Sequence, residues 1–293
     1  MVLISLFSFF YRFIRARVIH FYQRKLEKAG KLTHIEDAIE FGDNVLIKID
    51  KLCGDFLFSF HIPKSLETQL YDLVFPTPII SASFKSDMPI LNTWLKLGLG
   101  AVTVKTIMLD SRIGNKKPRI REVYVEGQQS LVNAMGLPGP GVEGLLTDFF
   151  HSQLMNWNRP IGFSIGGNSL EEYIQVFRAL EKGLLDYPQL STFYEFNISC
   201  PNVPGEKNYD LTTSFVSELL SRVRETSQAV VGIKVSPDFS DELILTIVGE
   251  MSKYVRVFVN MGNTQFKSCE ALGLPEGAIT IGGGGLSGPP LYE

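Results

Sequence analysis

From about residue 77 onward, short apolar segments alternate with segments of helical length. The apolar segments predict strands, which are Pro78–Ser83, Ala101–Lys105, Ile161–Ile165, Phe193–Ile198, Val230–Val235 and Val255–Asn260. The amphipathic stretches Leu170–Lys182 and Asp241–Lys253 predict helices, and Ser240 is placed to cap the second of them. Because each strand is followed by a helix, the pattern predicts an α/β fold with a parallel sheet.

The positions of polar residues favour one parallel-sheet architecture over another. Lys105, Asn197, Lys234 and Asn260 each lie at the C-terminal end of a predicted strand, and in a (β/α)8 barrel that edge is the active-site face. A doubly wound sheet would lead from its first strand into a GxGxxG turn, but Pro78–Ser83 is followed by FKSDMP. We therefore expect a (β/α)8 barrel of the TIM type.

The N-terminal segment differs in composition from the rest of the chain. Met1–Tyr11 is almost entirely apolar, and arginines follow it directly at positions 12, 15 and 17. Apolar residues then recur at four-residue spacing, which predicts an amphipathic helix over residues 1–30. The apolar run is about half of the ~20 residues that a spanning helix needs, and basic residues follow it rather than precede it, so a cleaved signal peptide also fits poorly.

Two interpretations of this helix remain open. In the first, the helix lies at a membrane surface, with aromatic anchors at Phe7, Phe9, Phe10 and Phe13. In the second, it packs on its own domain. Residues 31–65 show no clear pattern and are interpreted as a connecting segment, and the barrel is expected over residues 66–293.

Charge and cysteine content exclude several classes of protein. Lys and Arg number 28 against 31 Asp and Glu, a net charge of −3 that gives no reason to expect a nucleic-acid partner. Three cysteines and four histidines show neither a disulfide framework nor the spacing of a metal site. We expect a cytoplasmic protein without a structural metal, attached peripherally to a membrane if the first interpretation of the helix holds.

The most informative short motif runs from Asn197 to Asn202 and reads Asn-Ile-Ser-Cys-Pro-Asn. Its two carboxamides both donate and accept hydrogen bonds, which suits a planar ligand with imide or lactam edges. The thiol of Cys200 is open to three interpretations: a nucleophile, a general acid or base, or an inert buried group. Since no histidine lies in a visible pairing motif, proton abstraction is favoured over covalent catalysis.

Two lysines extend this edge of the predicted barrel. Lys105 and Lys234 both follow apolar strand residues, and either one alone is explained by a solvated or ion-paired side chain. Together with the asparagines they predict a site for an anionic or electron-accepting ring. Asn133 lies in the long loop between the second strand and its helix; that stretch is also compatible with a structured turn that binds nothing.

Taken in order, these motifs resemble those of the dihydroorotate dehydrogenases, which are flavin enzymes built on a (β/α)8 barrel. The motifs are Pro78–Ser83, Val104–Thr106 with Gly114–Arg119, Val132–Gly136, Asn197–Asn202, Gly232–Lys234 with Pro237-Asp238, Val259-Asn260 and Gly284–Gly288. They cover most of residues 66–293, and the ordered series is more specific than any one of its members.

The resemblance implies oxidation of dihydroorotate to orotate in pyrimidine biosynthesis, with the proton taken by Cys200 and the hydride by FMN. It implies substrate contacts from Asn133, Asn197, Asn202, Asn260 and Lys105. It implies cofactor contacts from Lys105, Asn197, Lys234 and Ser83.

The electron acceptor is left open between quinone and fumarate. The cysteine at the base position and the sequence AMGLPGPG are similar to those of soluble class 1 enzymes, whereas an apolar, basic N-terminal extension is similar to that of membrane-associated, quinone-using class 2 enzymes. A homodimer is a further expectation.

Six strands are visible before Glu293, and no segment resembles the seventh and eighth strands, whose loops commonly bind the cofactor phosphate in such barrels. An incomplete barrel that retains FMN poorly is therefore expected. Two alternative functions follow: a flavin barrel acting on another pyrimidine, or a non-catalytic, membrane-attached binding or structural protein.

Overall fold

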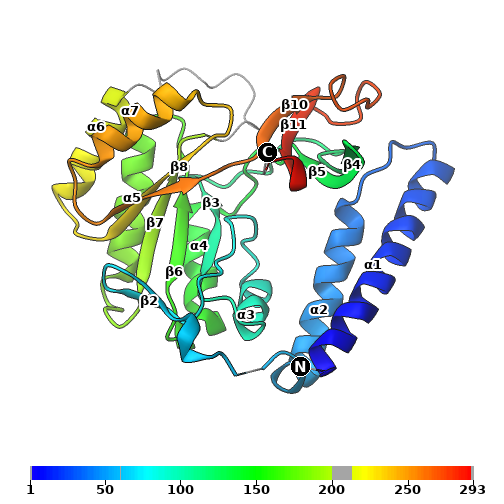
Figure 1. Cartoon of the computed structure of the whole chain (residues 1–293), viewed down its shortest axis with the longest axis horizontal. Coiled ribbons are helices and arrows are strands. Elements are labelled where there is room, and N and C mark those ends of the chain that lie inside the picture. Colours follow the sequence, from blue (N-terminus) through cyan, green and yellow to red (C-terminus); the bar gives the residue numbers. More distant parts are fainter. Residues whose placement is uncertain (1, 60, 200–212, 292–293) are drawn as a thin grey trace. The chain divides into compact units, whose positions relative to one another are not determined.

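The computed structural model describes residues 2–59, 61–199 and 213–291 and divides into two compact units (Figure 1). One unit comprises residues 1–60, 115–136 and 264–293, and the other comprises residues 61–114 and 137–263. Each unit is therefore assembled from segments that are distant in the sequence. The predicted domain boundaries after residues 30 and 65 stay predictions.

The second unit is built on a five-stranded parallel sheet. Its strands, in spatial order, are β3 (Val102–Ile107), β6 (Ile161–Ile165), β7 (Thr192–Asn197), β8 (Val230–Val235) and β9 (Val257–Met261). Its connecting helices are α4 (Gly141–Phe150), α5 (Leu170–Leu184), α6 (Thr213–Arg224) and α7 (Asp241–Met251) (Figure 1). The strands follow one another in chain order without the reversal of a doubly wound sheet, so the prediction of a TIM-type α/β fold is confirmed.

The two faces of this sheet differ because successive strand residues point to opposite sides. On the face toward the helices, Tyr194 and Phe196 are fully buried, and Phe177 of α5 packs on both, with ring centroids 5.0 and 5.9 Å away. The opposite face carries the buried polar side chains of Glu195 and Lys234. The sheet therefore has an apolar face under the helices and a polar face opposite it.

Apolar rings occupy the amino-terminal part of the opposite face. Phe193 packs against Phe75, which belongs to the hairpin of β1 (Thr68–Leu70) and β2 (Leu73–Phe75), and against Phe258. A Cβ added to Gly232 would lie 2.3 Å from the Phe258 ring, so glycine is required for this close approach. Polar groups are thereby confined to the carboxyl-terminal part of the face.

The helix start at Ser240 is confirmed, since its hydroxyl accepts from the Leu243 N–H at 3.2 Å.

The prediction of a strand over Pro78–Ser83 is wrong, because this segment does not form a regular strand. Only Ile80 bridges to Ala101, and the Ser81 hydroxyl accepts from the Thr103 N–H in place of a backbone carbonyl. A helix, α3 (Met88–Lys96), follows this irregular segment.

The first unit contains a four-stranded antiparallel sheet that the sequence analysis did not predict. Its order is β10 (Gln265–Ser268), β11 (Gly283–Ser287), β5 (Gln128–Asn133) and β4 (Ile120–Val125). The expected long loop around Asn133 is therefore wrong, because Asn133 is the last residue of β5. Glu126 and Gly127 have φ values of 52° and 77°, the positive values of a type I′ hairpin turn.

Helices α1 (Val2–Lys28) and α2 (Glu36–Leu57) complete this unit. A helix is confirmed at the N-terminus, but its apolar and polar residues are separated along its length more than between two faces. Helix α2 occupies most of the segment interpreted as a connection. Gly42 and Asn44 have low helix propensity, so the sequence pattern of a helix is weak in this segment. Packing decides the outcome, since Ile35 and Ala38 are buried with Ile19 of α1.

Charged groups join α2 to the residues directly before β4. The Glu36 carboxylate accepts hydrogen bonds from the Arg119 guanidinium at 2.7, 3.1 and 3.2 Å, and Asp37 accepts from Lys117 at 3.0 Å. The Arg119–Glu36 pair is largely shielded from solvent, where a paired geometry is needed to offset desolvation.

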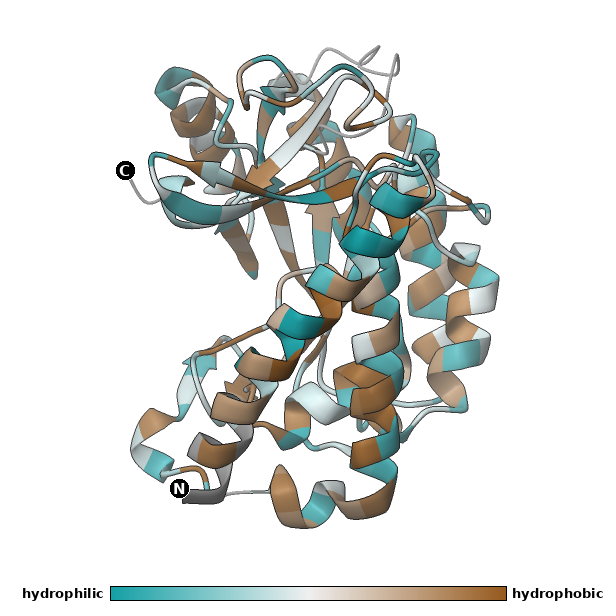
Figure 2. Ribbon diagram, turned by 90° about the vertical axis from the view of Figure 1, so that its right-hand side faces the viewer, coloured by the Kyte–Doolittle hydropathy of each residue, from teal (hydrophilic) through white to brown (hydrophobic). Residues whose placement is uncertain are grey.

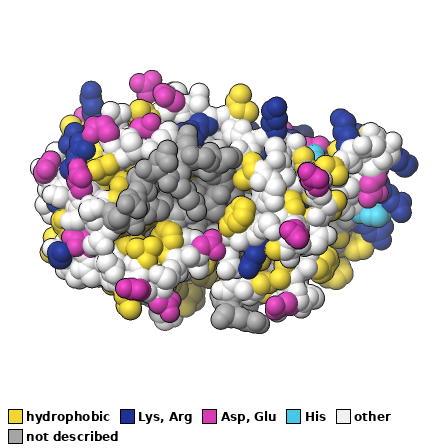
Figure 3. All heavy atoms as spheres, turned by 90° about the horizontal axis from the view of Figure 1, so that it is seen from above, with side chains coloured by type: hydrophobic (Ala, Val, Ile, Leu, Met, Phe, Trp, Pro, Cys, Tyr) yellow, Lys and Arg dark blue, Asp and Glu magenta, His cyan; other side chains and the backbone are white. Residues whose placement is uncertain are grey.

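Along α1, apolar residues concentrate in the N-terminal half and charged residues toward the C-terminal end (Figure 2). Phe9, Phe10 and Phe13 are each at least half exposed, at 65%, 51% and 55%. In the described ranges, no helix has the length and apolarity required to cross a bilayer. On the face shown in Figure 3, acidic and basic side chains are interspersed.

The imidazole of His34, which precedes α2, is buried in this unit. His34 is 8% exposed, and its Nδ1 has no hydrogen-bond partner among the described residues. Burial lowers the pKa of His34 from 6.5; Asp37 and Glu36 oppose this shift, whereas Lys117 and Arg121 add to it.

We expect the free energy of unfolding to fall as the pH is lowered from about 7 to about 5. As the pH falls, His34 takes up its proton at a higher pH in the unfolded chain than in the folded protein. The free energy of unfolding therefore decreases below the pKa of the unfolded state, by up to about 1.4 kcal/mol per pH unit. His34→Phe should remove this contribution, whereas His151→Gln, at an exposed histidine, should keep it. Urea unfolding followed by far-ultraviolet circular dichroism measures the slope, and equal slopes in all three proteins would contradict the prediction.

Candidate active site

Three of the predicted site residues lie at the same level of neighbouring strands. In the parallel register, Asn197 of β7 is opposite Lys234 of β8, and Lys234 is opposite Asn260 of β9. Asn197 and Lys234 are both 7% exposed. Because the strands are parallel and in register, their carboxyl ends present these three side chains on one face.

The Asn197 carboxamide is held from both sides. Its Nδ2 donates to the Thr106 hydroxyl at 2.9 Å, and its Oδ1 accepts from Asn263 Nδ2 at 3.0 Å. The register between β3 and β6 shifts between Val104 and Ile107, and at this irregularity the Thr106 hydroxyl also lies 3.1 Å from that of Ser164. These contacts fix the plane of the amide before any ligand binds.

Lys234 lies in a network around one buried carboxylate. Its Nζ donates to the Ser83 hydroxyl at 3.3 Å and lies 3.8 Å from Glu195 Oε1. Glu195, 3% exposed, also accepts from the Ser83 hydroxyl at 3.0 Å and from Asn260 Nδ2. Sequence reasoning missed Glu195 and Asn263. For Glu195 a signal was present: a carboxylate within an apolar strand, two residues before Asn197 and therefore on the same face.

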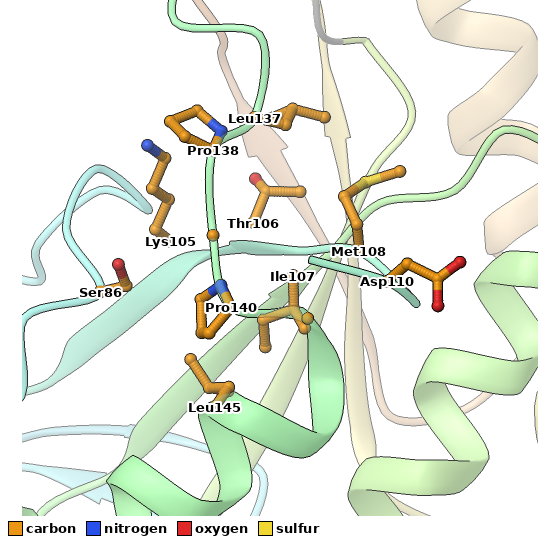
Figure 4. A pocket seen from close by; sticks show the side chains of 12 residues that line it. Ser86, Lys105, Thr106, Ile107, Met108, Asp110, Leu137, Pro138, Pro140 and Leu145 are labelled. Carbon is orange, nitrogen blue, oxygen red and sulfur yellow. The ribbon is translucent and has the colours of Figure 1, made fainter. Parts of the chain in front are cut away.

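Lys105, near the middle of β3, lines a pocket of the same unit. The pocket wall is mainly apolar, with Met108, Leu137 and Pro138 among its members, and Lys105 extends toward Pro138 (Figure 4). The Lys105 backbone N–H donates to the Lys85 carbonyl at 2.8 Å, which ties β3 to the segment after Ser83. Ser86, Thr106 and the Asp110 carboxylate add further polar groups to this wall.

The structure does not test the other predicted site residues as parts of this site. Asn133 belongs to the first unit, where its Nδ2 donates to the Gly285 carbonyl at 3.3 Å. Cys200 and Asn202 lie outside the described residues. In the described part of the chain, no three His, Cys, Asp or Glu side chains are placed to hold a metal ion.

On the helix-facing side of β7, a separate contact involves Tyr194 and Glu181. The Tyr194 hydroxyl donates to Glu181 Oε1 at 2.5 Å. Burial raises the pKa of Tyr194 far above its ordinary value of 10.0, and the neighbouring Glu181 carboxylate adds to that shift. Tyr194 therefore stays neutral and remains a hydrogen-bond donor.

The sequence is similar to those of known dihydroorotate dehydrogenases. A dihydroorotate dehydrogenase (quinone) of Thermus thermophilus is 28% identical over 234 residues, which are 77% of this chain and 64% of that protein. A dihydroorotate dehydrogenase B (NAD(+)) catalytic subunit of Desulforudis audaxviator is 36% identical over 145 residues, 49% of this chain and 44% of that subunit. The chain thus spans less than two thirds of the length of each of these two relatives.

A solved structure and a family match complete the comparison. The ligand-free DHODH of Eimeria tenella superposes with a TM-score of 0.66 at 20% identity, over 86% of this chain and 75% of that one, which supports the fold. The sequence model described as dihydroorotate dehydrogenase matches residues 65–293. With this match over most of its length, and with the polar strand ends in register, the chain belongs to the dihydroorotate dehydrogenase family.

Proposed function

We propose that the protein oxidises dihydroorotate to orotate in pyrimidine biosynthesis, with FMN as cofactor. The observation that carries this proposal is the convergence of Asn197, Lys234 and Asn260 at one level of the parallel sheet. Two carboxamides and an ammonium group there match a ring system with carbonyl and N–H edges. Family membership supports the same assignment.

The described residues fit a flavin. Lys234 supplies a buried ammonium group and Ser83 a hydroxyl, and the two are hydrogen-bonded to each other. Together with the Asn197 carboxamide they form a donor-rich set suited to the polar edge of an electron-accepting ring. When bound, FMN supplies the hydride acceptor.

The protein's own groups then have distinct roles. Asn197 and Asn260 orient the pyrimidine, and the Lys105 ammonium balances the substrate carboxylate and also contacts the cofactor. Substrate contacts from Asn133 and Asn202 are assigned through the resemblance alone. Cys200 removes the proton from C5 of dihydroorotate. This role is assigned through the resemblance of the Asn-Ile-Ser-Cys-Pro-Asn motif, and the asparagines need only position the ring for it.

We propose a quinone as the electron acceptor, because several of the similar enzymes are named for that acceptor. The test is anaerobic mixing of the FMN-loaded protein with dihydroorotate, followed by quinone or fumarate. Loss of the visible flavin absorbance with dihydroorotate, and its return with quinone only, is the expected result.

Other outcomes separate the alternatives. Bleaching by a different dihydropyrimidine but not by dihydroorotate would indicate a flavin barrel with another substrate. Failure to bind FMN at all would favour a non-catalytic relative.

We further propose that the protein is cytoplasmic and that α1 attaches it peripherally to a membrane. The exposed rings of Phe10 and Phe13 have the exposed Arg12 and Arg17 as neighbours in the same helix, and the Arg17 guanidinium lies 5.0 Å from the Phe13 ring centroid. This allows apolar insertion beside contacts to anionic headgroups. Full burial of one such ring is worth ~1.5–3 kcal/mol.

Phe10→Asp combined with Phe13→Asp should therefore lower vesicle binding at least a hundredfold. Flotation with anionic lipid vesicles measures this, and Leu185→Asp, at a 76% exposed position in the other unit, is the matched control. We expect alkaline carbonate to extract the unchanged protein from membranes. Equal flotation of all variants would favour a helix packed only on its own domain.

A further inference from the structure

Glu195 is a buried carboxylate to which neither the motifs nor the comparisons assign a role. It lies in β7 between Tyr194 and Phe196, and it is 3% exposed. A buried carboxylate carries a large desolvation cost unless hydrogen bonds and a counter-charge offset it. The hydrogen-bond partners of Glu195 therefore indicate the role of its side chain.

The two carboxylate oxygens serve different neighbours. Oε1 accepts from the Ser83 hydroxyl at 3.0 Å and lies 3.8 Å from Lys234 Nζ, whereas Oε2 accepts from Asn260 Nδ2. Among the described residues, no other carboxylate lies within 4.0 Å of Lys234 Nζ. Glu195 thus connects Ser83 and Lys234, which are proposed to bind the cofactor, with Asn260, which is proposed to bind the substrate.

The chemistry of a carboxylate determines the orientation of its amide neighbour. An ionised carboxylate only accepts hydrogen bonds, so the Asn260 amide must turn its NH₂ group toward Glu195. Its Oδ1 is then directed away from Glu195 and is available to accept a hydrogen bond. Asn260 is only half-buried, so this oxygen can meet a ligand.

We propose that Glu195 is a positioning residue that keeps the Asn260 oxygen available for an N–H group of a pyrimidine-type ligand. It does so while it holds Lys234 and Ser83 in the same network. This inference rests on the proposed function for the identity of the ligand. The orientation of Asn260 itself follows from the contacts of Glu195.

The replacement Glu195→Gln separates the two duties of the carboxylate. Glutamine has one acceptor oxygen and one NH₂ group. If its oxygen serves Lys234 and Ser83, its NH₂ group faces Asn260, and the Asn260 amide must flip to accept from it. Asn260 then presents its NH₂ group, in place of its oxygen, to the ligand. We expect the dissociation constant of orotate, measured by calorimetry on the FMN-loaded protein, to rise at least tenfold.

A second replacement, Asn260→Asp, combined with Glu195→Gln, restores the match of hydrogen-bond donors and acceptors between positions 195 and 260. The glutamine NH₂ then donates to the new carboxylate at position 260, its oxygen serves Lys234 and Ser83, and position 260 again presents an acceptor to the ligand. The double variant should therefore recover most of the lost orotate affinity. Glu181→Gln, which removes a carboxylate beside Tyr194 on the helix-facing side of the same strand, should change the dissociation constant less than twofold.

A measurement on the ligand-free protein keeps this proposal independent of the activity. With asparagine labelled by ¹⁵N, the side-chain NH₂ resonance of Asn260 is identified by its absence in Asn260→Asp, and it should move in Glu195→Gln because the charged acceptor is lost. An unchanged resonance, an orotate dissociation constant that stays within twofold, or a double variant no better than Glu195→Gln would overturn the role of Glu195. A moved resonance in a protein that binds no orotate would instead reject the proposed function and leave the orientation of Asn260 standing.

Discussion

The variant Cys200→Ala should oxidise dihydroorotate ~10²–10⁴-fold more slowly than the unchanged protein, because a positioned general base contributes about that factor. Orotate should still bind, since the thiol removes a proton and is not among the carboxamides that hold the ring. Single-turnover mixing of the FMN-loaded protein with dihydroorotate measures the rate. Near-normal single-turnover oxidation would remove Cys200 from the reaction.

Two further variants test this prediction for specificity. Cys53→Ala replaces an exposed cysteine of α2 and should leave the rate unchanged. Cys200→Ser should keep partial activity that rises toward higher pH, because a hydroxyl is harder to ionise than a thiol. A pH profile identical to that of the unchanged protein would argue against direct proton transfer at this position.

The replacement Phe177→Ala should lower the free energy of unfolding by ~3–5 kcal/mol. Phe177 is 1% exposed and lies between α5 and the rings of Tyr194 and Phe196. Its truncation leaves a cavity under the strand that carries Glu195 and Asn197. Since the free energy of unfolding of a single domain is only ~5–15 kcal/mol, this loss is a large part of the total stability.

Urea unfolding followed by tryptophan fluorescence measures this change, because Trp94 and Trp157 both belong to the same unit as Phe177. Leu185→Ala, at the 76% exposed C-cap of the same helix, is the control and should change the free energy by less than ~0.5 kcal/mol. Equal effects at the two positions would show that the Phe177 ring is not part of the rigid core.

The strands and helices of the parallel sheet were predictable because their signals are local. Ile161–Ile165 and Val230–Val235 form strands with the predicted bounds, since an apolar run between turn residues needs no distant partner to be recognised. The cap at Ser240 depends on residues within one helical turn. Asn197, Lys234 and Asn260 could be placed at one edge because parallel strands align their carboxyl ends.

The antiparallel sheet of the first unit could not be predicted in the same way. Asn133 of β5 pairs with Gly285 of β11, more than 150 residues later, and the pairing of distant strands leaves little trace in local periodicity. The β4–β5 hairpin did carry a signal, the Glu126-Gly127 pair between two alternating segments, which the sequence analysis did not use. α2 depended on burial of Ile35 and Ala38 with Ile19 of α1, a contact between different helices.

By itself, then, the sequence determined the periodic elements, the polar ends of the parallel strands and the motifs that show the family. Only the tertiary structure decided what a charged residue within a strand contacts. Glu195 is next to Tyr194 and Phe196 in the sequence, but Ser83 and Asn260 bond to it from 112 and 65 residues away. The cost of burying its charge is offset only after those segments assemble, so its role depends on contacts that no local pattern contains.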